Sequence, residues 1–430
     1  MKKVAFYTLG CKVNAYETET MKESFKQKDY EIVNFEDIAD VYVINTCTVT
    51  NTSDAKSRKY IRRAINQNKD AVIVVTGCLS QINPEQVKAI KGVDVIIGNK
   101  DKTKIVDYVN EYIRTKKQIE KINDLKNICF ENMNITSFDT KTRAIVKIQD
   151  GCNNYCSYCI IPYARGNIRS KKKEDVIKEV NDLVDNGYIE IVLTGINTGS
   201  YGKDINEYDF ANLLEELEKI DGLKRIRISS IEITELNEKV ITIMKKSKKI
   251  VNHLHIPLQS GSNSVLKRMN RKYDTKYFYK RIKELKKAFK DLSITTDVIV
   301  GFPGETIKEF NETYRFIKKI KFSKLHVFPY SKREGTPAAR MSNQIQNNTK
   351  QERVGKLIKL SEKLEINYMK KYKNKVLEII PEIEKDGYLV GHSTNYLKVK
   401  FKGNPSLIGK EIKIKINKIK YPYCLGILNN

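Results

Sequence analysis

Three cysteines stand close together near the middle of the chain, at Cys152, Cys156 and Cys159. Their spacing is Cys-x3-Cys-x2-Cys, and neither a fourth cysteine nor a histidine stands nearby. Thiolates hold iron–sulfur clusters, and a 4Fe-4S cube normally takes four of them. Three thiolates would leave one iron without a protein ligand. The motif therefore predicts a cluster whose open iron binds and reduces a small molecule.

A structural zinc site is the alternative interpretation of these three cysteines. Such sites are closed, four-coordinate and commonly built from Cys-x2-Cys pairs, which an odd count with this spacing fits poorly. The spacing resembles the cluster loop of the radical S-adenosylmethionine (SAM) enzymes, whose open iron chelates the amino and carboxylate groups of SAM. In that family, one electron from the cluster cleaves SAM to a 5′-deoxyadenosyl radical.

Three more cysteines, Cys11, Cys47 and Cys78, each follow an apolar, β-branched run in the first 110 residues. A helical pattern comes after each run, which is typical of a parallel sheet with helices on its faces. The C-terminal ends of parallel strands lie on one edge of the sheet, where ligands bind. We therefore expect these cysteines to converge on a second three-thiolate cluster site. The alternative is three unrelated buried cysteines, since cysteine is often buried.

The region after Arg143 has six short apolar segments separated by amphipathic helical stretches such as 174–186 and 276–290. The six candidate strands are residues 144–149, 189–194, 225–231, 253–258, 294–300 and 324–328. Six β/α units in this length predict an incomplete TIM-like barrel, with functional residues at the C-terminal ends of its strands. The Cys152 loop directly follows the first of these strands.

The charge of the chain favours a polyanionic partner. Lysine and arginine number 79 against 52 acidic residues, a net charge of +27, and such an excess attracts nucleic acid through phosphate neutralisation. From about residue 371, short strands alternate apolar residues with lysines, which predicts a small basic barrel of the OB kind that grips nucleic acid. Lysines on outer faces also serve solubility alone.

The predicted helix after Cys47 is a candidate contact for a tRNA backbone. It carries five cations within eight residues: Lys56, Arg58, Lys59, Arg62 and Arg63. Most charged helix faces are merely solvated, so the position beside a proposed cluster edge is what favours RNA.

Other features of the sequence limit the class to which the protein can belong. No apolar run approaches the roughly 20 residues that cross a bilayer, and the apolar stretch at the N-terminus is too short for a signal peptide. Eight cysteines in 430 residues are too sparse for a disulfide scaffold and fit a reducing compartment. We expect a cytoplasmic protein without membrane contact, and we assign no role to Cys129 or Cys424.

With two cysteine triads and three modules, the chain resembles the methylthiotransferase family of radical SAM enzymes over its whole length. The segments that carry the resemblance include Thr8-Leu-Gly-Cys-Lys-Val-Asn, Asn45-Thr-Cys-Thr-Val-Thr, Gly151-Cys-Asn-Asn-Tyr-Cys-Ser-Tyr-Cys and Ile228-Ser-Ser-Ile-Glu. The resemblance implies an N-terminal parallel α/β domain over residues 1–112 and a linker over 113–137. A partial (β/α)6 radical SAM barrel over 138–368 and an all-β, OB-like TRAM domain over 371–430 would follow.

The resemblance also implies the chemistry. Cys152, Cys156 and Cys159 would hold the cluster that cleaves SAM, and the Cys11, Cys47 and Cys78 triad an auxiliary 4Fe-4S cluster that carries or supplies sulfur. One SAM would donate a methyl group to that sulfur, and a second would yield the radical that abstracts hydrogen from C2 of an adenine. The net change is C–H to C–S–CH3.

The motifs look most like the type that modifies threonylcarbamoyladenosine next to the tRNA anticodon. Within the family, the alternatives are isopentenyladenosine in tRNA and an aspartate of a ribosomal protein. An alternative of another class is a zinc-stabilised RNA-binding protein without catalysis. The expected partners are tRNA and an electron donor of the flavodoxin or ferredoxin kind, and no feature of the sequence identifies the sulfur donor.

Polar residues and glycines at the ends of the predicted strands are candidate SAM contacts, because the family binds SAM at this mouth. They are Thr194, Gly195, Asn197, Gln259, Ser260, Asp297 and Gly301. Strand caps and turns are the alternative role for each. Arg165 is expected to pair with a carboxylate or a phosphate, and His253 and His255 to be satisfied interior histidines rather than ligands.

Overall fold

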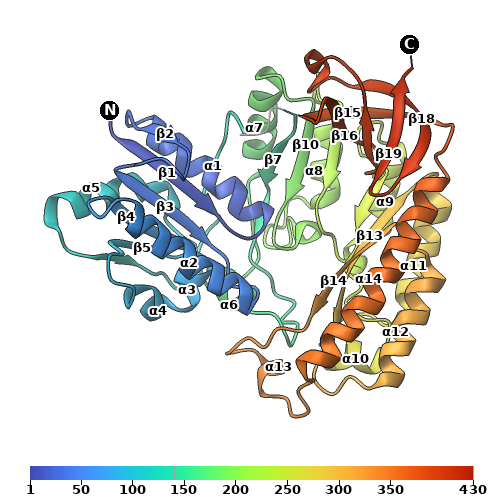
Figure 1. Cartoon of the computed structure of the whole chain (residues 1–430), viewed down its shortest axis with the longest axis horizontal. Coiled ribbons are helices and arrows are strands. Elements are labelled where there is room, and N and C mark those ends of the chain that lie inside the picture. Colours follow the sequence, from blue (N-terminus) through green and yellow to red (C-terminus); the bar gives the residue numbers. More distant parts are fainter. Residues whose placement is uncertain (139–141, 430) are drawn as a thin grey trace.

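The computed structural model describes residues 1–138 and 142–429, and it contains three domains along the chain (Figure 1). The first holds a six-stranded, all-parallel sheet in the order β2-β1-β3-β4-β5-β6. Its strands are β1 (Lys3–Thr8), β2 (Glu31–Val33), β3 (Val41–Thr46), β4 (Val72–Gly77), β5 (Val95–Ile97) and β6 (Ile119–Lys121). Every residue of β3 and β4 is buried, as expected for central strands covered on both faces.

Helices cover both faces of this sheet and pack into two separate apolar clusters. They are α1 (Lys12–Lys26), α2 (Asn51–Gln67), α3 (Cys78–Ile82), α4 (Pro84–Lys88) and α5 (Ile105–Thr115). The Thr50 side chain accepts a hydrogen bond from the Ser53 amide and so caps α2 three residues after Cys47. The chain therefore turns into a helix directly after the strand that leads to this cysteine.

The second domain is the predicted incomplete barrel, and that prediction is confirmed. Its parallel strands are β7 (Ala144–Lys147), β10 (Glu190–Thr194), β11 (Arg225–Ile228), β12 (His253–His255), β13 (Ser293–Val300) and β14 (Lys324–Pro329). They form two three-stranded sheets, β11-β10-β7 and β12-β13-β14. Parallel bridges between Ile226 and Ile250 and between Ser230 and His255 join the two sheets into one curved wall.

Amphipathic helices surround this wall and bury one large apolar cluster against it. They are α7 (Lys173–Asp185), α8 (Phe210–Glu218), α9 (Glu238–Lys246), α10 (Asn263–Arg268), α11 (Thr275–Ala288), α12 (Ile307–Ile320) and α14 (Asn347–Lys370). Shorter elements lie near the strand ends: β8 (Gln149–Asp150), α6 (Ile161–Arg165), β9 (Arg169–Ser170) and α13 (Pro337–Arg340). A capping box between Thr306 and Glu309 fixes the start of α12.

The third domain is a closed five-stranded barrel in the order β15-β16-β17-β19-β18, as predicted. Its strands are β15 (Val376–Lys385), β16 (Tyr388–Ser393), β17 (Lys398–Phe401), β18 (Ile412–Lys420) and β19 (Tyr423–Leu428). In β18, Ile414 and Ile416 point inward while Lys413 and Lys415 are exposed, which is the expected alternation. The small barrel packs against the central strands near their starts, where Arg225 pairs with Glu411 at 2.7 Å (Figure 1).

The structure corrects the expected linker. The boundary at residue 112 falls inside α5, and β6 pairs with β5 as an edge strand of the N-terminal sheet. Met133 and Ile135 then pack in the core of the barrel domain. A three-residue strand with one buried side chain, Ile119, leaves too short a pattern to recognise. The expected start of the barrel domain adjoins residues 139–141, which lie outside the described residues.

In the described part of the chain, no helix has the length and apolar character needed to cross a bilayer.

Candidate active site

Cys11, Cys47 and Cys78 lie at one edge of the N-terminal sheet. They follow the neighbouring strands β1, β3 and β4, and Thr46 and Gly77 are paired across β3 and β4. Burial, together with the neighbouring Cys78 and Cys11 thiols, raises the pKa of the Cys47 thiol to about 11. The three thiols are therefore close enough to interact.

Two glycines allow these cysteines to approach one another. Gly10 has a φ of +105°, and a Cβ there would lie 2.9 Å from Cβ and 3.1 Å from Sγ of Cys47. Gly77 has a φ of +101°, and its Cβ would lie 2.5 Å from the Thr46 carbonyl oxygen. Any other residue would be strained by its φ and would push the cysteine-bearing turns apart.

The Cys152, Cys156 and Cys159 loop follows β8 at the mouth of the barrel. The Cys152 amide donates to the Gly166 carbonyl at 3.0 Å, and the Cys159 amide donates to the Cys156 carbonyl at 2.9 Å. Burial raises the pKa of Cys152 to about 11 and of Cys159 to about 12, and Cys156 adds to both shifts. The loop thus holds three mutually interacting thiols.

A buried arginine lies against this loop. Arg271 Nη1 is 3.2 Å from Cys156 Sγ, and its other terminal nitrogen is hydrogen-bonded to Glu232. A cation beside a sulfur favours the thiolate, which is the form that binds iron.

A cavity of about 200 Å³ adjoins the Cys152 triad, and Asn197, Gln259 and Asp297 line it. Asn197 Oδ1 and Gln259 Oε1 are buried and accept no hydrogen bond from the described residues. Buried acceptors without donors fit a ligand that brings its own, as the ammonium group of SAM does. The chemistry of the cavity therefore fits SAM.

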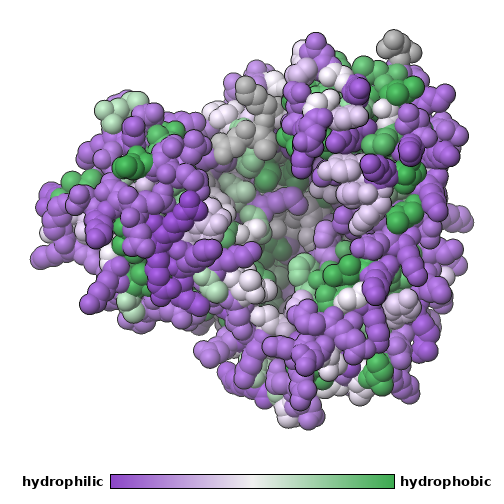
Figure 2. All heavy atoms as spheres, in the orientation of Figure 1, coloured by the Kyte–Doolittle hydropathy of each residue, from purple (hydrophilic) through white to green (hydrophobic). Residues whose placement is uncertain are grey.

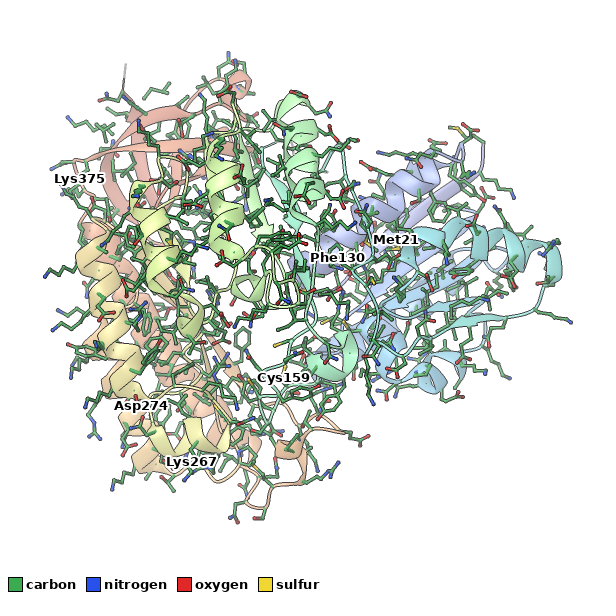
Figure 3. The ribbon with its side chains drawn as sticks, turned by 180° about the vertical axis from the view of Figure 1, so that it is seen from behind. Met21, Phe130, Cys159, Lys267, Asp274 and Lys375 are labelled. Carbon is green, nitrogen blue, oxygen red and sulfur yellow. The ribbon has the colours of Figure 1, made fainter. Side chains whose placement is uncertain are left out.

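A second cavity of about 270 Å³ lies next to this one, on the side of the N-terminal domain. It shares Cys159, Gln259 and Asp297 with the first cavity and continues to Val49 and Thr50, just after Cys47. Figure 2 shows the surface hollowed between the two domains, and Figure 3 places Cys159 at this junction. Two neighbouring cavities with shared lining residues therefore lie between the Cys152 loop and the Cys47 loop.

Four of the predicted SAM contacts are not among the residues that line either cavity: Thr194, Gly195, Ser260 and Gly301. The Ser260 hydroxyl is paired with Thr313 Oγ1 at 3.1 Å. A Cβ on Gly195 would lie 2.7 Å from Gln149 Oε1, so this glycine makes room for a neighbouring side chain. Gly301 has a φ of +69°, and its amide donates to Glu305, as a turn requires.

The residues that motif reasoning missed are Ser230, Glu232 and Arg271. Ser230 and Glu232 line the first cavity just beyond the end of β11, within the segment Ile228-Ser-Ser-Ile-Glu. Their position after a barrel strand was a usable signal. Arg271 follows α10, and no periodicity marked it.

Arg165 is fully buried and pairs with carboxylates rather than with a phosphate. His253 and His255 both hydrogen-bond Thr295 Oγ1, at 3.1 and 2.9 Å, which makes them satisfied interior histidines. In the basic helix α2, Arg58 contacts Gln86 and Arg63 pairs with Glu36, whereas Lys56, Lys59 and Arg62 are exposed.

Within the described residues, no three His, Cys, Asp or Glu side chains surround a point where one metal ion would bind. All eight cysteines are free thiols. Each thiolate binds a different corner of a cubic cluster, so the three sulfurs of a triad need not surround one point. The groups around the sulfurs then decide whether a cluster fits. Arg271 beside Cys156 and Asn99 Nδ2, 3.5 Å from Cys78 Sγ, are donors of the kind that surround cluster sulfurs.

Comparison with known proteins gives the class and then the family. Residues 146–317 match the radical SAM superfamily, and residues 3–98 match a family described as uncharacterized protein family UPF0004. The solved structure of the radical S-adenosylmethionine methyltransferase TsrM from Kitasatospora setae is similar in fold. Its TM-score is 0.59 at 13% identity, over 79% of this chain and 77% of that one. The central domain is thus a radical SAM barrel.

Two relatives narrow the assignment. The threonylcarbamoyladenosine tRNA methylthiotransferase MtaB of Bacillus subtilis is 56% identical over 99% of this chain and 96% of its own. The tRNA-2-methylthio-N(6)-dimethylallyladenosine synthase of Alkaliphilus oremlandii is 36% identical over 96% of this chain and 90% of its own. The chain belongs to the methylthiotransferase family of radical SAM enzymes, as its motifs predicted.

Proposed function

We propose that this enzyme inserts a methylthio group at C2 of threonylcarbamoyladenosine next to the anticodon of tRNA. The observation that carries the proposal is the 56% identity, over essentially the full chain, to a relative named for this substrate. The relative named for dimethylallyladenosine is 36% identical. The two adjacent cavities between the cysteine-bearing edges support a reaction that needs both edges at one adenine.

Each triad is assigned one 4Fe-4S cluster. Cys152, Cys156 and Cys159 hold the cluster beside the SAM cavity, and Cys11, Cys47 and Cys78 hold the auxiliary cluster that carries or supplies sulfur. When bound, the clusters and SAM supply the radical and methylthio chemistry. The protein orients them: Asn197 and Gln259 offer acceptors to SAM, and Arg271 lies beside the sulfur of Cys156.

The tRNA contacts follow from exposed positive charge. Lys56, Lys59 and Arg62 of α2 lie in the helix that begins beside Cys47, and lysines cover the outer face of the C-terminal barrel. Neutralising phosphates in this way gives affinity without sequence specificity. A ferredoxin- or flavodoxin-like protein supplies the electrons, and the enzyme acts in the cytoplasm.

Complementation tests the substrate. The gene is expressed in a bacterial strain that lacks its own threonylcarbamoyladenosine methylthiotransferase, and the tRNA nucleosides are analysed by mass spectrometry. We expect the methylthio form of threonylcarbamoyladenosine to return. Recovery of only the methylthio form of isopentenyladenosine, or of a modified ribosomal aspartate, would assign the substrate elsewhere.

Cysteine variants test the two assigned clusters. The anaerobically purified protein should contain about eight irons, because each cube holds four. Cys152→Ala should abolish SAM cleavage, whereas Cys47→Ala should spare cleavage and abolish methylthiolation. Cys129→Ala is the matched control, since Cys129 is exposed and belongs to neither triad. Equal loss of SAM cleavage in the Cys152 and Cys47 variants would contradict this division of roles.

A further inference from the structure

A group of buried charges lies between the two triads. Its centre is Glu17 in α1, whose carboxylate pairs with Arg165, with Lys102 and, at 2.7 Å, with Lys147. Arg165, Lys102 and Glu17 have no exposed side-chain surface. Burial alone would raise the pKa of Glu17, but these cations hold it well below its usual range. Glu17 is therefore an anion in the folded protein.

The positive charges in this group outnumber the negative ones. Asp150 is the second carboxylate, and it pairs with Lys147 at 2.7 Å, with Arg165 at 3.3 Å and with Arg169 at 3.5 Å. Four basic side chains thus share two carboxylates, and all six side chains are buried. Burial, with Arg165 and Lys147 close by, lowers the pKa of Lys102, whereas Glu17 opposes that shift. An uncompensated buried charge is costly, so a further anion close by would stabilise this group.

The sulfurs of Cys11 and Cys78, two cysteines of the auxiliary triad, lie on the other side of two asparagines from this group. Arg165 Nη2 donates to Asn14 Oδ1 at 2.6 Å, and the same oxygen is 3.9 Å from Cys11 Sγ. Lys102 Nζ donates to Asn99 Oδ1 at 3.0 Å, and Asn99 Nδ2 is 3.5 Å from Cys78 Sγ. One asparagine therefore stands between each of these cations and a cysteine of the auxiliary triad.

Arg165 is also tied to the other triad. It is the last residue of α6, which begins two residues after Cys159. The next residue, Gly166, accepts the hydrogen bond from the Cys152 amide. The guanidinium at the auxiliary site is therefore carried by the loop that presents the SAM-site cysteines.

We infer that Arg165 and Glu17 set the reduction potential of the auxiliary cluster from opposite directions, as positioning residues that do not ligate it. This inference rests on the proposed function. Adding one electron to a cluster adds one negative charge, which a nearby buried cation stabilises and a nearby buried anion opposes. Loss of the Arg165 charge should lower the potential, and loss of the Glu17 charge should raise it.

The test isolates the auxiliary cluster. In the full chain, Cys152, Cys156 and Cys159 are all changed to alanine, which should leave about four irons if the auxiliary triad holds a cube. Arg165→Gln, Arg165→Lys and Glu17→Gln are then added separately. The midpoint potential of each protein is measured by anaerobic titration with dithionite, followed by electron paramagnetic resonance. Lys219→Gln, an exposed cation of the outer barrel surface, is the matched control.

We expect a lower potential in Arg165→Gln, a higher one in Glu17→Gln, and values near the parent in Arg165→Lys and Lys219→Gln. Rescue by lysine separates the effect of charge from that of the guanidinium contacts. Shifts of the same sign in the two glutamine variants, or no shift in either, would overturn the inference. If Arg165→Gln does not fold, the Glu17→Gln variant tests the inference alone. A higher potential than the parent then supports it, and an equal or lower one overturns it. Absence of iron from the parent would instead refute the auxiliary cluster itself.

Discussion

Arg333 connects the loop after Cys47 to the barrel domain, and its removal should make that loop more mobile. Its guanidinium reaches from the segment after β14 into the N-terminal domain. There it donates to Thr48 Oγ1 at 2.6 Å and to Asn51 Oδ1 at 2.7 Å, and it pairs with Asp54 at 2.8 Å. Both partners of the ion pair are buried. We therefore expect Arg333→Ala to loosen the turn that carries Cys47.

The size of the expected effect on local opening follows from the Asp54 carboxylate, which Arg333→Ala leaves without its partner. Removing one partner of a buried ion pair costs about 3–5 kcal/mol, because the other charge stays buried without compensation. Since about 1.4 kcal/mol corresponds to a factor of ten, local opening should become at least about 100-fold more frequent. Hydrogen–deuterium exchange of the amides in residues 47–54 measures that opening directly.

Two further variants make the result decisive. Adding Asp54→Asn to Arg333→Ala removes the uncompensated carboxylate, so exchange should slow at least about tenfold relative to Arg333→Ala alone. Arg340→Ala removes an exposed arginine seven residues away and should leave exchange unchanged. A change below about threefold in Arg333→Ala, or no recovery in the double variant, would refute the assigned role of this ion pair.

Two other predictions concern the barrel. Burial lowers the pKa of His253 well below its ordinary value, and Arg227 adds to the shift, so this imidazole stays neutral when the unfolded chain takes up a proton. Between pH 7.5 and 5.5 His253 should therefore cost up to about 1.4 kcal/mol of stability. Comparing urea unfolding of the wild type and His253→Gln at both pH values checks this, and parallel losses would contradict it. Asn197→Leu removes an acceptor proposed for the SAM ammonium, which should raise the KM for SAM about 10- to 150-fold (~1.5–3 kcal/mol) with little change in kcat. An unchanged KM in a SAM-cleavage assay would exclude that contact.

The sequence predicts the barrel framework well because its apolar segments stand out, and even the three-residue strand β12 lies within the longer predicted segment 253–258. All six barrel strands occur where apolar, β-branched segments stand between amphipathic helices, and the closed C-terminal barrel follows from the alternation in β18. The sequence analysis does not predict the three-residue strands β2, β5 and β6 of the N-terminal sheet, and β6 depends on pairing with β5. Tertiary pairing, rather than local preference, creates such an edge strand.

Site residues were predictable only where position along a strand decides their role. Asn197 and Asp297 follow that rule and line the cavity, whereas Ser260 points into a helix contact and Gly301 serves a turn. The pairing of Glu17 with Arg165 joins residues 148 positions apart. Neither residue carries a local signal of its partner, so only the packed structure reveals the pair.

The positions of Cys11, Cys47 and Cys78 depend on the barrel domain as well as on their own sheet. Arg165 donates to Asn14 in the helix that follows Cys11, and Arg333 donates to Thr48 in the turn after Cys47. Asn99, beside Cys78, donates to the Ala164 carbonyl at 2.7 Å. Buried ion pairs add little net stability but are costly to break, so these contacts favour the docking arrangement that the structure shows. A reaction that joins a radical and a sulfur at one carbon requires such a fixed arrangement, because small misplacements of reacting groups are costly.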